Sequence, residues 1–308
     1  MSGLPDLSLK LGRLVLKNPV MPASGTFGYG QEYEQFVDLN QLGAVITKTI
    51  TPKPHLGSFP HRLTEVPSGS LATIGLQNVG IDRFIEDKLP YFEGLQVPLI
   101  ISIGAETVED YVDVTKKVDL QKRINGIELN VSCPNVKKGG IHFGVDLEVI
   151  RELVTCLRQT TDKTLIIKLS PMVADIRPFA EICQQCGADG ITLINAPVGM
   201  AIDIETRRSR LGRNITGGLT GPAIRPLAVR WVWWVARTVD IPILGVGGIT
   251  GAEDALEFII AGASAVEIGT YNFVDPEALL KTMEGIRTYM ARHHVRTLKE
   301  LIKSLEVS

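Results

Sequence analysis

The sequence predicts an α/β fold of the (β/α)8 barrel type, and three observations support this prediction. Eight short apolar runs rich in Val, Ile and Leu recur along the 308 residues, with little of the alternation typical of half-exposed strands. Helix-like periodic segments separate most of these runs, and no shift in composition divides the chain. A doubly wound open sheet is the alternative. Eight successive units favour the closed barrel, and we expect a single domain over residues 1–308.

The predicted strands follow one another at 20–25, 44–49, 99–104, 126–132, 165–170, 190–196, 243–249 and 265–270. The periodic segments between them include 107–118, 146–160 and 252–263. Residues 8–19 alternate around Gly12, which predicts an N-terminal β-hairpin before the first strand. The segment TLKE at 297–300 matches a capping box and predicts a final helix.

Two connections are longer than all the others. One runs from Thr49 to the end of the third strand at Gly104, and the other runs from Ala196 to Ile249. Loops that follow the strands of such a barrel lie on its C-terminal face, where these barrels carry their chemistry. We therefore expect the long loops after strands 2 and 6 to border the active face.

The composition excludes several classes of protein. Apolar residues make up 44% and charged residues 21%, which is ordinary for a globular chain and unlike a disordered one. The formal net charge of −2 provides no basic excess for binding nucleic acid. We expect no signal peptide, because the N-terminus MSGLPDLSLKLG has no apolar h-region. We also expect no membrane span, because no run of about 18 apolar residues occurs.

The four cysteines are too few for a disulfide framework in a chain of this length, so we expect the cytoplasm as the compartment. Cys183 and Cys186 form a C-x-x-C, which can be half of a metal site or a redox pair. Without a second such pair, the simpler interpretation is two small apolar residues on one helix face. The five histidines show no metal-ligand spacing, and we expect no metal site.

Polar and small residues gather at the carboxyl ends of the predicted strands. Lysine is rarely buried without a partner, so Lys48 and Lys168 indicate an anion or an electron-rich ring, although each can instead pair with a neighbouring carboxylate. Glycines after strands 7 and 8 let backbone N–H groups approach a phosphate, which predicts a phosphorylated ligand. Cys133, on the loop after strand 4, can be a nucleophile, a base or a bystander. The strand ends present Ser24, Lys48, Asn130, Lys168, Asn195, Gly247, Gly248, Gly269 and Thr270.

Motifs spread over about residues 5 to 290 resemble one enzyme family. They are PASGTFGYG (22–30), TKTIT (47–51), IGLQNVG (74–80), NVSCPNVKKGG (130–140), KLSP (168–171), AIDIETRRSRLGRNITGGLTGPAI (201–224), GVGGI (245–249) and IGTYNF (268–273). Together they resemble the FMN-containing dihydroorotate dehydrogenase family. The cysteine loop followed by VKKGG is similar to its class 1B catalytic subunit, which works with an iron–sulfur and FAD subunit.

The resemblance implies an oxidoreductase with FMN at the mouth of a TIM barrel. Lys168 would stabilise negative charge on reduced flavin, and the glycine pairs would take the phosphate. The residues that match the family's cofactor site are Ser24, Lys48, Thr49, Ser102, Asn130, Lys168, Ile194, Gly221, Gly247, Gly248, Gly269 and Thr270.

The implied reaction is the oxidation of dihydroorotate to orotate in pyrimidine biosynthesis. Cys133 would remove a proton from C5 of the substrate while a hydride passes from C6 to flavin N5, and Lys48 would assist at the same site. Electrons would then leave through the iron–sulfur/FAD subunit, so we expect a homodimer or a heterotetramer with that subunit. The residues that match the substrate site are Lys48, Gly75, Leu76, Asn130, Asn135, Asn195 and Ala196.

Three positions depart from the family pattern. Ala72 stands where the family has an Asn that contacts orotate, and Ala196 replaces a hydroxyl residue that also contacts it. Ser102 stands where an Asn is common near the flavin. Each lost hydrogen bond to a buried ligand costs about 1–3 kcal/mol if nothing replaces it.

These departures leave three hypotheses. The first is the class 1B catalytic subunit. The second is an FMN oxidoreductase of the same fold that acts on a less polar ring, such as a dihydropyrimidine without the carboxylate, and Ala72 and Ala196 favour it. The third is a flavin-binding module without its own turnover, and Cys133 argues against it because an inactive site need not keep its base.

Overall fold

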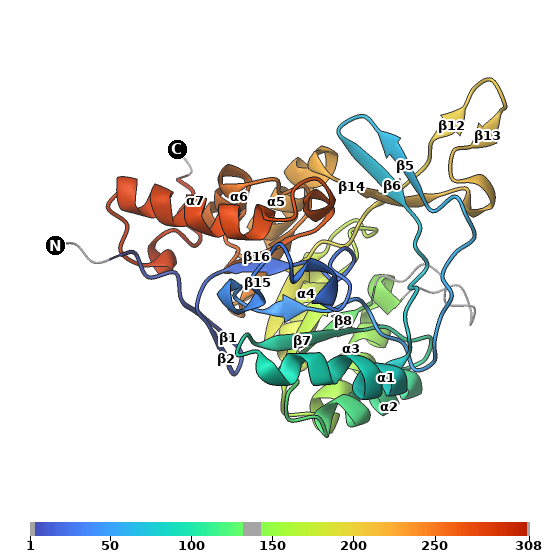
Figure 1. Ribbon diagram of the computed structural model, residues 1–308. Coiled ribbons are helices and arrows are strands. Elements are labelled where there is room, and N and C mark those ends of the chain that lie inside the picture. Colours follow the sequence, from blue (N-terminus) through green and yellow to red (C-terminus); the bar gives the residue numbers. More distant parts are fainter. Residues whose placement is uncertain (1–3, 132–142, 307–308) are drawn as a thin grey trace.

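A computed structural model describes residues 4–131 and 143–306 of the chain (Figure 1). Its central sheet has eight strands in the order β3-β16-β15-β10-β9-β8-β7-β4, and the neighbours pair in parallel. Each predicted strand run overlaps one of them, which confirms the predicted order of elements. Their bounds are β3 Val20–Pro22, β4 Val45–Ile46, β7 Leu99–Ile103, β8 Gly126–Asn130, β9 Thr164–Lys168, β10 Gly190–Leu193, β15 Ile243–Val246 and β16 Ala265–Ile268.

The two outer strands of this order, β3 and β4, also meet. The backbone N–H of Gly43 donates to the carbonyl of Val20 at 3.0 Å, just before β4 begins. A Cβ atom on Gly43 would collide with the carbonyl of Asn18, so only glycine permits this approach. The contact brings the sheet round to a nearly closed barrel, which confirms the barrel over the doubly wound sheet.

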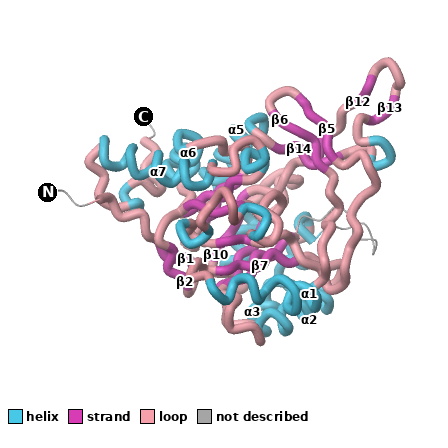
Figure 2. The backbone as a smooth tube through the Cα atoms, in the orientation of Figure 1, coloured by secondary structure: helices cyan, strands magenta, loops and turns pink. Residues whose placement is uncertain are grey.

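Helices cover the outside of the barrel (Figures 1 and 2). Side chains cap the first turns of two of them, because Thr107 accepts from the N–H of Asp110 and Asp146 accepts from the N–H groups of Glu148 and Val149. The helices are α1 Ile81–Arg83, α2 Val108–Asp119, α3 Leu147–Thr160, α4 Arg177–Gln185, α5 Arg225–Val235, α6 Ala252–Ala261 and α7 Ala278–Arg292.

The predicted N-terminal hairpin closes one end of the barrel. Strands β1 Leu9–Leu11 and β2 Leu14–Leu16 pair antiparallel around Gly12, whose φ of 57° suits glycine. Leu11 and Leu16 are fully buried and belong to an apolar cluster with one side chain from most of the strands. We call this cluster the plug: Leu11, Leu16, Met21, Ala44, Ile46, Ile100, Ile166, Leu244 and Ala265.

The two long connections do more than border the C-terminal face, because they join in one antiparallel sheet. Its order is β11-β14-β6-β5, with Leu71 opposite Leu219, and we call it the cap sheet. A separate hairpin, β12–β13, projects beyond it (Figure 1). The bounds are β5 Leu63–Val66, β6 Gly69–Ala72, β11 Val198–Gly199, β12 Ile202–Asp203, β13 Arg208–Ser209 and β14 Gly217–Thr220.

The prediction of a final helix is wrong. The capping box between Thr297 and Glu300 forms, but it starts only a 3₁₀ turn, Leu298–Glu300. After the turn, the N–H of Lys303 donates to the carbonyl of Ile259 at 3.1 Å, so the chain binds the end of α6 instead of continuing a helix. Tertiary hydrogen bonds therefore override the local signal.

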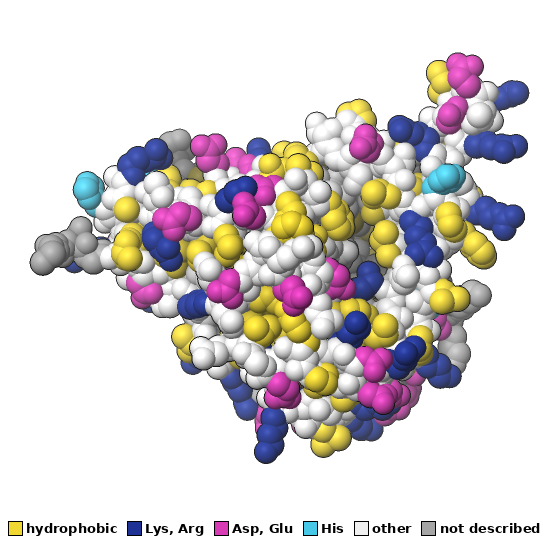
Figure 3. All heavy atoms as spheres, in the orientation of Figure 1, with side chains coloured by type: hydrophobic (Ala, Val, Ile, Leu, Met, Phe, Trp, Pro, Cys, Tyr) yellow, Lys and Arg dark blue, Asp and Glu magenta, His cyan; other side chains and the backbone are white. Residues whose placement is uncertain are grey.

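Within the described part of the chain, no helix is both long and apolar enough to cross a membrane. On the face seen in Figure 3, acidic and basic side chains are interspersed, and basic ones gather beside the projecting hairpin. The exposed arginines of that connection are Arg207, Arg208, Arg210 and Arg213. The organisation of residues 1–308 as a single domain stays a prediction.

Candidate functional site

A line of hydrogen-bonded polar side chains crosses the C-terminal end of the barrel. The hydroxyls of Thr49 and Ser102 lie 2.9 Å apart, and the amide of Asn130 donates to Thr49 at 3.5 Å. The amide of Asn195 donates to the side-chain oxygen of Asn130 at 3.2 Å. All four residues were predicted for the site, and the structure brings them together where β4, β7, β8 and β10 end.

Lys48 borders this line at the end of β4. Burial lowers the pKa of Lys48, the carboxylate of Glu32 partly restores it, and Arg62 lowers it further. The side chain lines a hollow of about 490 Å³ together with Gly25, Thr26 and Glu32. An anion that binds there would meet a lysine whose charge is only partly balanced, which suits a carboxylate ligand.

Lys168, at the end of β9, is already paired inside the barrel. Its Nζ donates to Oε2 of Glu267 at 2.8 Å and lies 3.6 Å from Oε1 of Glu128. Burial lowers the pKa of Lys168, but the two carboxylates more than offset this, and the net shift is upward. Pairing with neighbouring carboxylates, the alternative for this lysine, therefore explains its burial without an outside anion.

The glycines after β15 fit a close approach to a ligand. Gly247 and Gly248 have φ values of 134° and 74°, and Gly221 has 88°. A Cβ atom on Gly248 would lie 2.8 Å from the carbonyl of Gly221 and 3.0 Å from the backbone nitrogen of Arg225. Gly248 therefore packs directly against Gly221 and the start of α5, and a side chain there would collide with the backbone.

Asp254 of α6 fixes the loop that holds these glycines. It accepts hydrogen bonds from the N–H and the hydroxyl of Thr250 at 2.8 and 2.6 Å, and its other oxygen pairs with the guanidinium of Arg225. The loop after β15 is therefore tied to α5 and α6 at once.

The end of β16 is less constrained. Gly269 has a φ of −106°, and a Cβ atom there would meet Ala23 at 3.5 Å, an ordinary contact. Thr270 begins a 3₁₀ turn, Thr270–Phe273. Ser24, another predicted cofactor residue, is buried. Sterics therefore require glycine at Gly248 but not at Gly269. Ile194 is buried after β10, and its N–H donates to the carbonyl of Val246 at 3.1 Å.

Gly75 and Leu76 lie in a turn held by Asn78. Their φ values are 71° and 52°, and the Asn78 amide donates to the carbonyl of Leu76 at 2.7 Å. A Cβ atom on Gly104, at the end of β7, would lie 3.6 Å from the Leu76 side chain. This turn of the first long connection therefore reaches the barrel mouth, where the prediction placed it.

The two alanines that depart from the family pattern lie together. Ala72 on β6 pairs with Gly218 on β14, and a Cβ atom on Gly218 would lie 2.7 Å from the Cβ of Ala196. Two changes far apart in sequence thus meet at one glycine of the cap sheet. Both alanines therefore lie next to Gly218.

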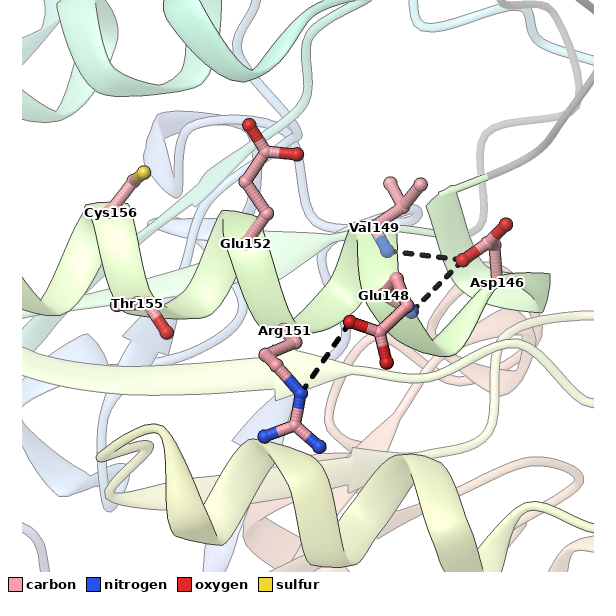
Figure 4. Close-up of a pocket in the computed structure, with 7 residues that line it drawn as sticks. All are labelled: Asp146, Glu148, Val149, Arg151, Glu152, Thr155 and Cys156. Carbon is pink, nitrogen blue, oxygen red and sulfur yellow. Dashed lines mark hydrogen bonds and ion pairs between the residues drawn. The ribbon is translucent and has the colours of Figure 1, made fainter.

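Other predicted features lie away from this mouth or outside the described residues. Cys133 and Asn135 fall outside them. A hollow of about 440 Å³ on α3 is lined by Asp146, Glu152, Cys156 and neighbours, and includes none of the predicted site residues (Figure 4). Cys183 is buried on α4, and burial raises the pKa of its thiol, which supports the helix-packing interpretation of the C-x-x-C. Within residues 4–131 and 143–306, no group of three or more His, Cys, Asp or Glu side chains is placed to hold a metal ion.

Glu128, Thr192 and Glu267, which lie near Lys168 inside the barrel, were not among the predicted site residues. A signal for the two glutamates was present, because each is the one charged residue in a run that otherwise reads as a fully buried strand. A charge in such a run must have a partner, and the lysine at the end of β9 was the available cation.

Comparison of the chain with known proteins identifies its family. The family model for dihydroorotate dehydrogenase matches residues 6–290. The catalytic subunit of dihydroorotate dehydrogenase B (NAD(+)) from Geotalea daltonii is 48% identical over 98% of this chain and 99% of its own length. Those from a Thermoanaerobacter species and from Geobacter sp. strain M21 are 48% and 46% identical over the same shares. The chain belongs to the dihydroorotate dehydrogenase family.

Proposed function

We propose that this chain oxidises dihydroorotate to orotate and serves as the catalytic subunit of a class 1B enzyme. The observation that carries the proposal is the hydrogen-bonded line of Thr49, Ser102, Asn130 and Asn195 at the barrel mouth. Lys48 immediately precedes Thr49 in the chain. Amides and hydroxyls in this arrangement suit a flat ring with alternating donors and acceptors. Near-complete coverage by relatives of 46–48% identity supports the same reaction.

We propose FMN as the cofactor at this mouth. Gly221, Gly247 and Gly248 form a place without side chains that a phosphate can approach. The proposed remaining contacts are those matched by motif, namely Ser24, Lys48, Thr49, Ser102, Asn130, Lys168, Ile194, Gly269 and Thr270. When bound there, FMN would supply the acceptor for a hydride.

The chain's own residues then bind and deprotonate the substrate. Lys48 would attract the substrate carboxylate, and Asn130 and Asn195 would orient the ring through their amides. Gly75, Leu76, Asn135 and Ala196 would border it. Cys133 would take the C5 proton at its Sγ, which requires a thiolate, on the strength of its sequence motif.

A second candidate substrate is a dihydropyrimidine without the carboxylate. The observation that favours it is the meeting of Ala72 and Ala196 at Gly218, which gives the mouth one apolar edge. A less polar ring would leave no unpaired group against that edge.

We also propose an iron–sulfur/FAD partner subunit as the electron acceptor, a homodimer of this chain or a heterotetramer with that subunit, and the cytoplasm as the compartment. The name "catalytic subunit" of the relatives supports the partner. The cysteine content favours a reducing compartment.

Anaerobic mixing of the purified protein with excess dihydroorotate or dihydrouracil tests the proposal. Dihydroorotate should bleach the oxidised-flavin absorbance, and Cys133→Ala should slow this bleaching while the flavin stays bound. Bleaching by dihydrouracil alone would instead establish the second candidate. Flavin reduction by dithionite but by neither substrate would contradict both, and a protein unable to take up FMN would also overturn the cofactor.

A further inference from the structure

Four polar side chains meet inside the barrel, one from each of β8, β9, β10 and β16. Glu128, Thr192 and Glu267 are fully buried, and Lys168 is 5% exposed. Lys168 contacts both carboxylates, as described above, and Thr192 lies between the same two groups. We call Glu128 and Glu267 the buried carboxyl pair.

The hydroxyl of Thr192 makes too many contacts for two ionised carboxylates. Its Oγ1 lies 3.0 Å from Oε2 of Glu128 and 3.2 Å from Oε1 of Glu267. A hydroxyl has one hydrogen to donate, and an ionised carboxylate has none. If both glutamates were ionised, one of these contacts would bring two oxygens together with no hydrogen between them. A proton on one carboxyl would give each of the two contacts its own hydrogen.

The balance of charge also indicates that only one of the two carboxyls is ionised. Two carboxylates buried side by side cannot both ionise unless cations balance them, and only one lysine is present here. In the strand register, Met21, Ser102, Ile166 and Leu244 lie opposite members of this group, and none of them is titratable. Burial and the Glu128 carboxylate raise the pKa of Glu267 well above its ordinary 4.5, and Lys168 only partly offsets this.

We propose that Glu128 and Glu267 hold one proton between them through the hydroxyl of Thr192, so that the cluster with Lys168 is electrically neutral. One carboxyl donates its proton to Thr192 Oγ1 while the Thr192 hydrogen is donated to the other carboxylate. Moving both hydrogens along this line exchanges the protonated partner without changing the total. The proton belongs to the pair, not to either glutamate alone.

The shared proton makes Glu267 a positioning residue for Lys168. The 2.8 Å hydrogen bond from Lys168 Nζ to Glu267 fixes the ammonium, and the neutral cluster sets the charge below the barrel mouth. This step rests on the proposed function: if Lys168 contacts FMN, loss of the proton would place a net negative charge under the flavin. The flavin's reduction potential would then fall as the pair ionises.

Infrared spectroscopy of the full-length protein tests the proton directly. At neutral pH, where exposed carboxyls are ionised, the wild type should show the carbonyl stretch of one protonated carboxyl. Glu128→Gln and Glu267→Gln should each lose this band, because the remaining glutamate ionises beside Lys168. Thr192→Val should keep the band but shift it, since the acid loses its acceptor. Glu284→Gln changes an exposed glutamate on α7 and should leave the band unchanged.

Absence of the band from the wild type at neutral pH would overturn the proposal, as would its survival in both glutamine variants. If the variants fail to fold, carbon-13 NMR of labelled glutamate in the wild type still decides whether one carboxyl stays protonated. As a second measurement, the midpoint potential of the holoenzyme should lose a pH-dependent step in Glu267→Gln, which a merely structural role would not produce. If the flavin is not reduced by dihydroorotate but the infrared band is present, the proposed substrate is wrong and the shared proton is still supported.

Discussion

The two ends of the barrel interior are built from the same strands but from opposite chemistry. Ile166 and Ala265 contribute to the apolar plug, whereas Lys168 and Glu267, two residues further along the same strands, carry buried charges. Residues two apart on a strand point to the same side, so both sets face the barrel interior. Along each of these two strands, only two residues separate the apolar layer from the polar layer.

The apolar plug stabilises the fold, whereas burial of the charged side chains costs stability. Burial of each large plug side chain contributes about 1.5–3 kcal/mol. Taking an ion out of water costs several kcal/mol, and pairing only partly repays it. Burial of the apolar plug therefore offsets the cost of the charged layer. Substitutions in the two layers should lower the free energy of unfolding for different reasons.

Lys168→Met should have the largest effect, because it leaves the buried carboxyl pair without its cation. We expect a loss of about 3–5 kcal/mol in the free energy of unfolding at neutral pH, measured by urea denaturation. Adding Glu267→Gln to this variant should recover part of the loss. A change below about 1 kcal/mol would contradict the pairing of Lys168 with the glutamates.

Leu16→Ala removes a fully buried side chain from the plug and should cost about 2–5 kcal/mol of unfolding free energy. The flavin absorbance of the folded variant should stay that of the wild type, because the plug lies at the other end of the barrel. Val15→Ala on the same strand is the control, since Val15 is 74% exposed and its loss should change stability by no more than about 0.5 kcal/mol. Equal effects of the two variants would rule out the plug.

Gly248→Ala should weaken flavin binding and cost about 1–3 kcal/mol of stability, because φ is positive and the new Cβ would press on the carbonyl of Gly221. Fluorescence titration of the apoprotein with FMN measures the first effect. Gly251→Ala is the matched control: its backbone is extended and nothing lies within 4 Å of its Cβ position. Tight FMN binding by Gly248→Ala would exclude this place as the phosphate site.

The stability difference between wild type and Glu267→Gln should depend on pH. Above the ordinary glutamate value of 4.5 the folded pair keeps a proton that the unfolded chain releases. The wild type should therefore lose stability relative to the variant by about 1.4 kcal/mol per pH unit, from that point up to the raised pKa. Denaturation at several pH values measures this slope. Glu284→Gln should show none, and a flat difference for Glu267→Gln would argue against a proton held in the folded state.

Ala72→Asn should produce the smallest effect and sharpens the assignment of substrate. If orotate binds at this edge, the added amide should tighten it by about 0.5–1.5 kcal/mol, or roughly two- to tenfold in Kd. Titration of the flavin absorbance with orotate measures the change. Unchanged orotate binding together with weaker dihydrouracil binding would favour the less polar substrate.

The strand order could be predicted because each barrel strand is a continuous apolar run, a local signal that survives in any tertiary context. The cap sheet could not, because Leu71 and Leu219 pair across segments that lie far apart in the chain and carry no local signal for each other. Asn130 and Asn195 were predicted because strand ends share one edge, and Thr49 and Ser102 were predicted from the family resemblance. The structure brings the four together. Glu128 and Glu267 were not predicted because they lie inside the apolar strand runs, and only residues at the strand ends were considered as site residues.

The cap sheet also determines the order in which the protein can assemble. The hydroxyls of Ser70 and Thr220, 3.0 Å apart, come from positions 150 residues apart in the chain. Contacts so distant carry a high loop-closure entropy and form late in folding. During synthesis β5 and β6 cannot pair with β14 until the chain has been made as far as β14. By then six of the eight barrel strands have been made. The entrance to the site therefore cannot be completed before β14 has been made.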